Sequence, residues 1–181
     1  MALSTGINIG CTDENRRGGI KTLWITERDN VDTTSGFTAG SDHDYTAVTM
    51  TSTAVKFYKF EFDSFTGDFN TEASAENGSK VLAISGDFKV PKQEKVKAKV
   101  LQELFNTCKV IVVAEDFNQK FFVYGYDEFL EHSGAMIVTV SSVTGKGLQD
   151  ESGYTIAFEG QMAELPREFT GDTTDATKFE Q

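Results

Sequence analysis

A histidine and two carboxylates stand together in the sequence, where His43 lies between Asp42 and Asp44. Imidazole and carboxylate groups are common metal ligands, so this trio has the chemistry to hold a metal ion. The flanking residues are polar and typical of an exposed loop, and no second set of ligands lies nearby in the sequence. We therefore interpret His43 as part of a solvated turn and predict no metal site.

The second histidine, His132, follows Glu131 and precedes Ser133. Distance along the sequence does not forbid a nucleophile triad, because triad members meet only in the fold. No serine, however, stands in the strand-to-helix turn that exposes such a nucleophile. We predict no catalytic residue, and an enzyme is the least favoured class.

Two further patterns resemble ligand sites only in part. The Gly145-Lys146-Gly147 run lacks the frame and the following helix of a phosphate loop, so we predict a turn and no cofactor site. Four residues are spaced like loosely arranged calcium ligands, but the loop glycine and terminal glutamate of an EF-hand are missing. Alternation along a strand explains these four residues better: Asp63, Asp68, Asn70 and Glu72.

One amphipathic helix is predicted at about residues 92–107. Pro91 suits the first helical position, because its missing N–H has no partner there in any case. Apolar residues then recur at helical spacing on one face, with lysines around them. We expect this face to plug the core through six side chains: Val96, Val100, Leu101, Leu104, Phe105 and Cys108.

The rest of the chain predicts antiparallel strands with short turns. Alternating β-branched and aromatic residues indicate strands at 20–27, 46–50, 54–62, 65–74, 80–89, 109–115, 120–127, 135–143 and 153–162. Residues 116–119 separate two such runs, and Asn77-Gly78 suits a type I′ turn, so both places predict hairpins. The expected fold is mainly β with one α-helix, an antiparallel β-sandwich or half-barrel.

The 181 residues suit one domain, although two small units would also fit this length. We expect an N-terminal arm at 1–19, a single β-sandwich domain at 20–166 and a mobile or partner-ordered C-terminal tail at 167–181. Residues 29–44 are rich in Asp, Thr, Ser and Gly, which predicts a long surface loop and a contact element.

The formal net charge of −11 argues against a groove that binds nucleic acid, since such a groove needs clustered Lys and Arg. Cys11 and Cys108 form neither a zinc spacing nor a disulfide framework, so we expect reduced thiols. The first residues lack the pattern of a signal peptide, and no long apolar run occurs. The sequence thus predicts a soluble chain that is neither exported nor membrane-spanning.

Fifteen phenylalanines are an unusually large aromatic supply. An ordinary sandwich core would bury many of these rings. Alternatively, some rings are covered only by a neighbouring copy of the chain. The rings considered for this second role are Phe57, Phe117, Phe121 and Phe169.

The order of the expected elements resembles the tail tube proteins of tailed bacteriophages. Two stretches carry the resemblance, residues 18–25 (GGIKTLWI) and residues 153–160 (GYTIAFEG), the second followed closely by Pro166. The resemblance implies a β-sandwich flanked by one helix, with six copies in a ring and rings stacked into a tube. The inner sheets would join into a barrel around a channel for double-stranded DNA. Tubes of contractile injection and type VI secretion systems are related to this family.

The resemblance also implies partners and a location. The chain would contact other copies of itself, other tail proteins and any sheath, and it would reside in the virion tail after synthesis in the host cytoplasm. The net charges of six copies, −11 each, sum to about −66. Repulsion between this charge and the DNA phosphates would keep passing DNA from adhering to the wall of the channel. The arm, the 29–44 loop and the tail would bridge rings. Candidate contacts between subunits are Trp24, Asp29, Asp32, Phe37, Asp44, Phe117 and Phe169.

Two alternatives remain open at this stage. The chain could be another virion component, such as a head-to-tail connector ring, a tail terminator or a capsid decoration protein. It could instead be a β-sandwich module that binds a carbohydrate or another small ligand. Trp24, Tyr124 or Tyr126 would then have to form an exposed platform.

Overall fold

The computed structural model describes residues 18–76, 79–130, 134–147 and 149–181. These residues fold into two β-sheets, one α-helix and a short 3-10 helix, which confirms the mainly β class with one helix. Seven strands form one sheet in the order β2-β3-β11-β8-β7-β1-β4. Their bounds are β1 (Ile20–Glu27), β2 (Phe37–Ala39), β3 (Asp44–Val48), β4 (Tyr58–Phe60), β7 (Val110–Asp116), β8 (Phe121–Tyr124) and β11 (Glu168–Phe169).

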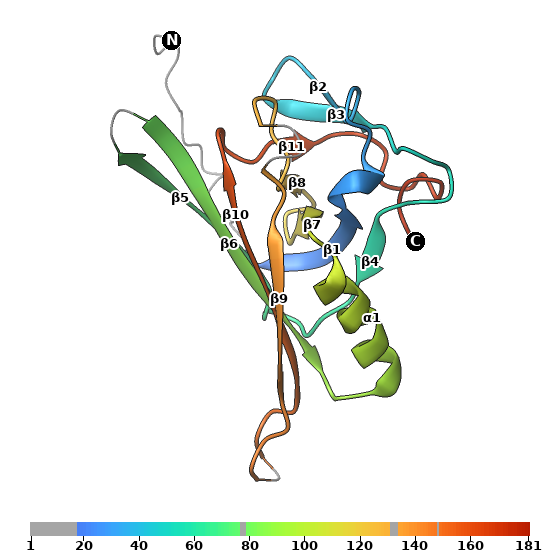
Figure 1. Cartoon of the computed structure of the whole chain (residues 1–181), viewed down its shortest axis with the longest axis vertical. Helices are drawn as coiled ribbons and strands as arrows, with labels where there is room; N and C mark the ends of the chain where they lie inside the picture. Colours follow the sequence, from blue (N-terminus) through green and yellow to red (C-terminus); the bar gives the residue numbers. More distant parts are fainter. Residues whose placement is uncertain (1–17, 77–78, 131–133, 148) are drawn as a thin grey trace.

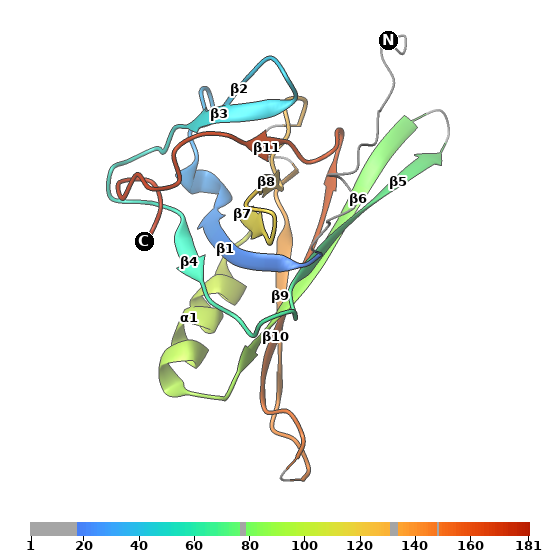
Figure 2. The same cartoon turned by 180° about the vertical axis from the view of Figure 1, so that it is seen from behind.

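Four longer strands form the second sheet in the order β5-β6-β10-β9, and every pair in it is antiparallel. Their bounds are β5 (Asp68–Glu76), β6 (Ser79–Pro91), β9 (Ile137–Val143) and β10 (Gly153–Met162). This sheet extends beyond the rest of the fold (Figure 1). The β5–β6 hairpin projects at one end and the β9–β10 hairpin at the opposite end, as the reverse view also shows (Figure 2).

The seven-stranded sheet is buried on both faces, because its side chains alternate between two cores. The first core lies between the sheets, where Leu23 and Ile25 of β1 pack with Phe88 and Phe158 of the other sheet. The second core covers the far face and contains Trp24 from the same strand. Strand β1 therefore serves both cores, as its mixed pattern predicts.

The helix differs most from its sequence prediction. Pro91 ends β6 instead of starting a helix, Lys92 reverses the chain with φ 64°, and α1 spans Lys95–Asn106. Only Leu101 and Leu104 of the six expected side chains are buried. The helix covers an open side of the first core and contributes only these two side chains to it. The other four expected side chains are exposed: Val96, Val100 and Phe105 of the helix, and Cys108 beyond its end.

The two segments expected to be irregular contribute to the second core. The 29–44 loop contains β2, whose Phe37 is buried. The sequence predicts a mobile or partner-ordered tail at residues 167–181, and the structure corrects this: β11 inserts between β3 and β8 of the same chain, and Phe179 is fully buried. Few residues in this acidic, Thr-rich stretch are apolar, so their long-range contacts give no periodic signal. The N-terminal arm lies outside the described residues, apart from Gly18 and Gly19.

The strands predicted at 20–27 and 153–162 form with the same bounds, and the other predicted strands form with shifted bounds. The 116–119 hairpin is confirmed: Asp116 Oδ1 accepts from the backbone N–H groups of Asn118 and Lys120 at 2.8 and 2.9 Å. The strand expected at 54–62 is reduced to Tyr58–Phe60, since Phe57 pairs with Phe179. The β5–β6 hairpin forms as expected, while its tip at residues 77–78 lies outside the described residues.

Candidate functional site

The four-stranded sheet has one apolar face and one polar face. Residues such as Phe69, Phe88 and Phe158 point into the first core, so their neighbours along each strand point away from it. The outward positions, which we call the polar face, are mostly Ser, Thr, Ala and acidic residues. Its charged residues, among those that the structure describes, are Asp68, Glu72, Asp87, Lys89 and Glu159.

Negative charge on the polar face is concentrated where β5 meets β6. Asp68 lies directly opposite Asp87 in the ladder. Burial and then a hydrogen bond and charge repulsion from Asp68 raise the pKa of Asp87 above its usual value of 3.8. Nearby, the Nζ atom of Lys89 donates to Glu151 at 2.9 Å. The polar face therefore carries a carboxyl pair that lysine neutralises only in part.

Both edges of this sheet are unpaired in the described part of the chain. Strand β5 pairs only with β6, and β9 pairs only with β10. Strand β9 also exposes Ile137 and Val143, at 56% and 57%. An unpaired edge presents free backbone N–H and C=O groups that can pair with another strand. These two edges are thus candidate assembly surfaces.

The β4 edge of the other sheet is closed by contrast. The carboxylate of Glu180 accepts from the backbone N–H of Lys59 at 2.9 Å, and the backbone N–H of Glu180 donates to the Phe57 carbonyl at 2.8 Å. The indole of Trp24 donates to the Glu180 carbonyl at 3.0 Å. The end of the chain thus occupies the hydrogen-bonding positions that an added strand would need.

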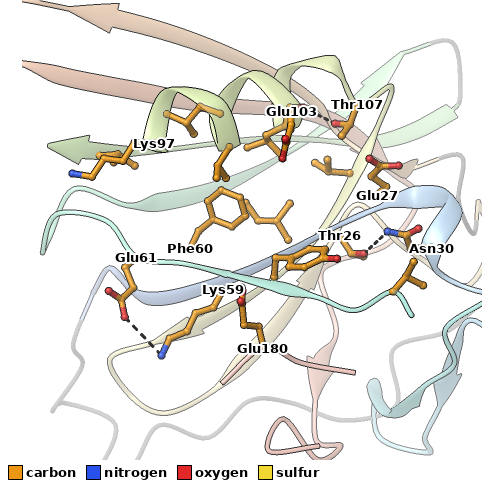
Figure 3. Close-up of a pocket in the computed structure, with 18 of the residues that line it drawn as sticks. Thr26, Glu27, Asn30, Lys59, Phe60, Glu61, Lys97, Glu103, Thr107 and Glu180 are labelled. Carbon is orange, nitrogen blue, oxygen red and sulfur yellow. Dashed lines mark hydrogen bonds and ion pairs between the residues drawn. The ribbon is translucent and has the colours of Figure 1, made fainter. Parts of the chain in front are cut away.

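A groove of about 770 Å³ separates α1 from β4 and the end of β1. Its walls include Val96 and Val100 of the helix and Tyr58 of β4, which are 65%, 42% and 44% exposed. Phe60 lies between these walls (Figure 3). The amphipathic pattern of α1 predicts a buried apolar face here, so no sequence signal indicated an open groove.

Most aromatic candidates for subunit contacts are covered by their own chain. Trp24, Phe37, Phe57 and Phe169 are 8%, 7%, 0% and 2% exposed and belong to the second core. For Phe57 and Phe169 the alternative of coverage by a neighbouring copy is therefore wrong, and the rings belong to the core of their own chain. Phe121 is partly buried against the same core.

Phe117 remains as an aromatic surface candidate. Its ring stacks on Phe65 with 5.1 Å between centroids, and Phe65 is 79% exposed. Phe65 also has φ 63°, which is uncommon for a large side chain. The platform proposed for a ligand-binding module does not form, because Trp24, Tyr124 and Tyr126 are all buried.

Three carboxylates of the 29–44 segment are predicted to make contacts between subunits. Asp29 is exposed, and Asp32 and Asp44 are partly exposed. Asp29 pairs with Arg28 at 2.8 Å. Asp32 accepts from the backbone N–H groups of Thr34 and Ser35 at 2.7 and 2.8 Å, so it holds a turn. Asp44 accepts from the Thr170 hydroxyl at 2.9 Å and so connects β3 to the residue that follows β11. Each has a local structural partner, and their role between subunits stays a prediction.

The polar motifs with possible chemistry also have structural partners. His43 lies in an exposed turn with φ 60°, and its Nε2 atom is 3.1 Å from the Leu165 carbonyl oxygen. Asp150 accepts from the backbone N–H groups of Lys146 and Gly147, each at 2.7 Å, so a phosphate would have to displace that carboxylate. Within the described ranges, no group of three or more His, Cys, Asp or Glu residues could hold a metal ion. His132 lies outside those ranges.

The possible calcium ligands do not converge either. Asp68, Asn70 and Glu72 follow one another along the polar face of β5, as strand alternation predicts, while Asp63 precedes this strand. These residues are therefore part of the polar surface of the sheet.

A buried ion-pair cluster holds the start of β11 in place. The Arg167 guanidinium donates to Glu164 at 2.9 Å and to Glu128, and it lies 5.2 Å from the centre of the Tyr45 ring. Burial acts to raise the pKa of Glu164, but the hydrogen bonds from Arg167 and the Glu128 backbone, together with the positive charge of Arg167, lower the pKa overall. This cluster therefore connects the start of β11 to Glu128 and to Tyr45 of β3.

Comparison with known proteins found no matching family model, no matching curated protein and no matching solved structure. In the part of the chain that the structure describes, no helix has the length and apolarity needed to cross a membrane. The site is therefore interpreted from its own geometry.

Proposed function

We propose that this chain is a virion structural protein of a tailed bacteriophage, a tail tube subunit that assembles into stacked rings. Backbone pairing between sheet edges would join neighbouring copies within each ring. The observation that carries the proposal is the four-stranded sheet, with two open edges, one polar face and one face on the core. Because the strand number is even and every pair is antiparallel, β9 of one copy and β5 of the next run antiparallel. The ladder can therefore continue around a ring.

The dimensions of such a ring suit a channel. Six copies would form a barrel of roughly 24 strands, more than the 16–18 of porins, which already enclose an aqueous channel. A strand spacing of about 4.8 Å gives a barrel diameter of about 35–50 Å, depending on strand tilt. In this barrel the polar faces of the six sheets would together form one continuous lining of the channel.

The charge of the polar face supports a lumen through which DNA passes without binding. Facing inward, Asp68, Glu72, Asp87 and Glu159 outnumber Lys89 in each copy. Like charge repels the phosphates at separations within a Debye length of about 8 Å at physiological salt. In the proposed tube these four carboxylates would be the lumen charges.

Electron microscopy of the purified protein over a concentration series, with its mass in solution, tests the proposal. We expect hollow rings or tubes of uniform width. The variant Ile137→Lys/Val143→Lys adds two cations to the exposed β9 edge, and we expect it to form no rings or tubes. Leu165→Lys changes a residue of similar exposure away from that edge and is the matched control.

The outcomes separate the candidate functions. Rings that form equally well in the edge variant would contradict pairing through β9. A wild-type protein that stays monomeric at every concentration, with and without tail partners, would contradict the tail tube proposal. It would favour a capsid decoration protein instead.

A further inference from the structure

The groove between α1 and β4 is apolar and open in the described chain. Apolar side chains at its surface include Tyr58, Val96 and Val100, with Ile25, Leu101 and Leu104 beneath them. Isolated apolar residues are common on protein surfaces, whereas a group of them in a concave site marks a binding surface. We therefore expect the groove to bind a partner segment that has an apolar face.

The occupant cannot be held as an extra strand of the sheet. The outward N–H of Lys59 on β4 already donates to the Glu180 carboxylate. An incoming segment must therefore be held mainly by its side chains, which pack against the helix and Phe60. This requirement favours a segment whose apolar residues all point to one side.

Charge restricts the occupant further. The groove lining contains Glu27, Glu61, Glu103 and Glu180 but only two lysines, Lys59 and Lys97. Glu27 and Glu103 lie toward the Thr107 end, away from Lys97 and Glu61 (Figure 3). Acidic side chains in the occupant would be repelled, so the occupant should carry none.

Residues 1–12 of this chain have both properties. Their sequence, MALSTGINIGCT, contains no acidic residue. Met1, Leu3, Ile7, Ile9 and Cys11 all stand at odd positions, and the even positions hold small or polar residues. In an extended segment this period of two places the apolar side chains on one face. Twelve extended residues span about 40 Å, more than enough to cross the groove.

We propose that residues 1–12 of one copy bind in the α1–β4 groove of a second copy. The segment joins the described fold at Gly18–Gly19, beside Gly67, whereas the groove begins at the opposite end of β1. Strand β1 is paired on both edges and mostly buried on both faces, so no direct path along it leads to the groove of the same chain. The inference rests on the proposed self-assembly, because it needs a second copy.

This contact joins two different surfaces, so each copy can give a segment and receive one. Such heterologous contacts close into rings or continue as filaments. The groove would then connect copies separately from the β5 and β9 edges. It would also cover Val96, Val100 and Tyr58, which the isolated chain leaves exposed.

Disulfide cross-linking of the full chain tests the contact. In a Cys11→Ser/Cys108→Ser background, one protein carries Ile7→Cys and a second carries Val100→Cys, and the two are mixed and oxidised. A disulfide forms only when the Cα atoms approach to about 4.4–6.8 Å. We expect a cross-linked dimer roughly tenfold more abundant than with the controls, because a bound segment has a high effective concentration.

Two controls match the two positions. Lys99→Cys replaces Val100→Cys with a neighbouring helix residue whose side chain is 79% exposed and outside the groove. Asn8→Cys replaces Ile7→Cys with a residue of the opposite face of the segment. Equal cross-linking by these controls would overturn the proposal.

The remaining outcomes separate this inference from the proposed function. Rings or tubes without the Ile7–Val100 cross-link would overturn the inference and leave the tail tube proposal standing. A cross-link within one chain, in a protein that carries both cysteines and is diluted below assembly, would overturn the role of the second copy. The expected dimer without any rings would support the groove contact and contradict the tail tube proposal.

Discussion

The ring of Phe179 lies almost parallel to the ring of Phe57, with 5.1 Å between centroids and 17° between planes. Both rings are fully buried, and backbone hydrogen bonds join the two segments on either side of them. The end of the chain is therefore part of the second core. This contact also places Glu180 where it closes the β4 edge.

Replacing Phe179 with alanine tests this role. The substitution removes a fully buried ring and leaves a cavity, so we expect the free energy of unfolding to fall by about 3–5 kcal/mol. Urea unfolding followed by Trp24 fluorescence measures the change, since Trp24 contacts the same ring. The control is Lys178→Ala, which removes a partly exposed ion pair worth at most about 1 kcal/mol. Similar effects for both variants would contradict a packed C-terminal segment.

Arg167→Met tests the buried ion-pair cluster. The guanidinium and the Glu164 carboxylate are 9% and 12% exposed, so removing one partner leaves a buried charge. We expect a loss of about 3–5 kcal/mol in unfolding free energy at neutral pH. Lys120→Met, which breaks the more exposed pair with Glu168, should cost about 1 kcal/mol or less.

The same cluster predicts a dependence on acid. Arg167 holds the pKa of Glu164 below its usual value of 4.5, so this carboxylate stabilises the fold above that pH. The stabilisation is lost as the pH falls through the lowered folded-state pKa. Unfolding measured from neutral pH downward should therefore show a smaller acid dependence in Arg167→Met than in the wild type. Equal dependence would contradict the assigned pairing.

Tyr124 predicts a loss of stability in alkali. Burial and then the charge of Asp116 raise its pKa from 10.0 to about 12. Stability from the neutral phenol is complete below about pH 10 and is lost as the pH rises towards 12. Between these values we expect wild-type unfolding free energy to fall by up to about 2–3 kcal/mol more than that of Tyr124→Phe. Parallel curves would show that Tyr124 ionises freely in the folded chain.

Asp87→Asn tests the carboxyl pair of the polar face. Repulsion between Asp68 and Asp87 opposes folding at neutral pH, so we expect the variant to gain roughly 0.2–1 kcal/mol. The gain should disappear as the pH falls from the raised pKa of Asp87 towards 3.8, because Asp87 is then protonated in the wild type. Glu72→Gln removes an exposed charge from the same face and is the control. A loss of stability in Asp87→Asn would contradict the repulsive pair.

The sequence alone determined the class of fold and most of its strands. Alternating side chains and the 116–119 turn are local signals, so they can be recognised without knowing which strand pairs with which. The alternation of residues along β5 also predicted that its acidic side chains lie on one face of the strand. What local pattern could not supply was which edges stay unpaired, because pairing depends on residues far apart in the chain.

Tertiary structure decided two surfaces that the sequence pattern did not predict, the groove beside α1 and the closed β4 edge. The apolar face of α1 predicts burial, but the helix covers the core at its open side and leaves Val96 and Val100 in a groove. The C-terminal residues have little periodicity, yet Phe179 completes the second core and Glu180 closes a sheet edge. Both results depend on how the two sheets are placed relative to each other, because this placement sets the space that a helix or a C-terminal segment can fill. The helical or strand period of a sequence does not determine that placement.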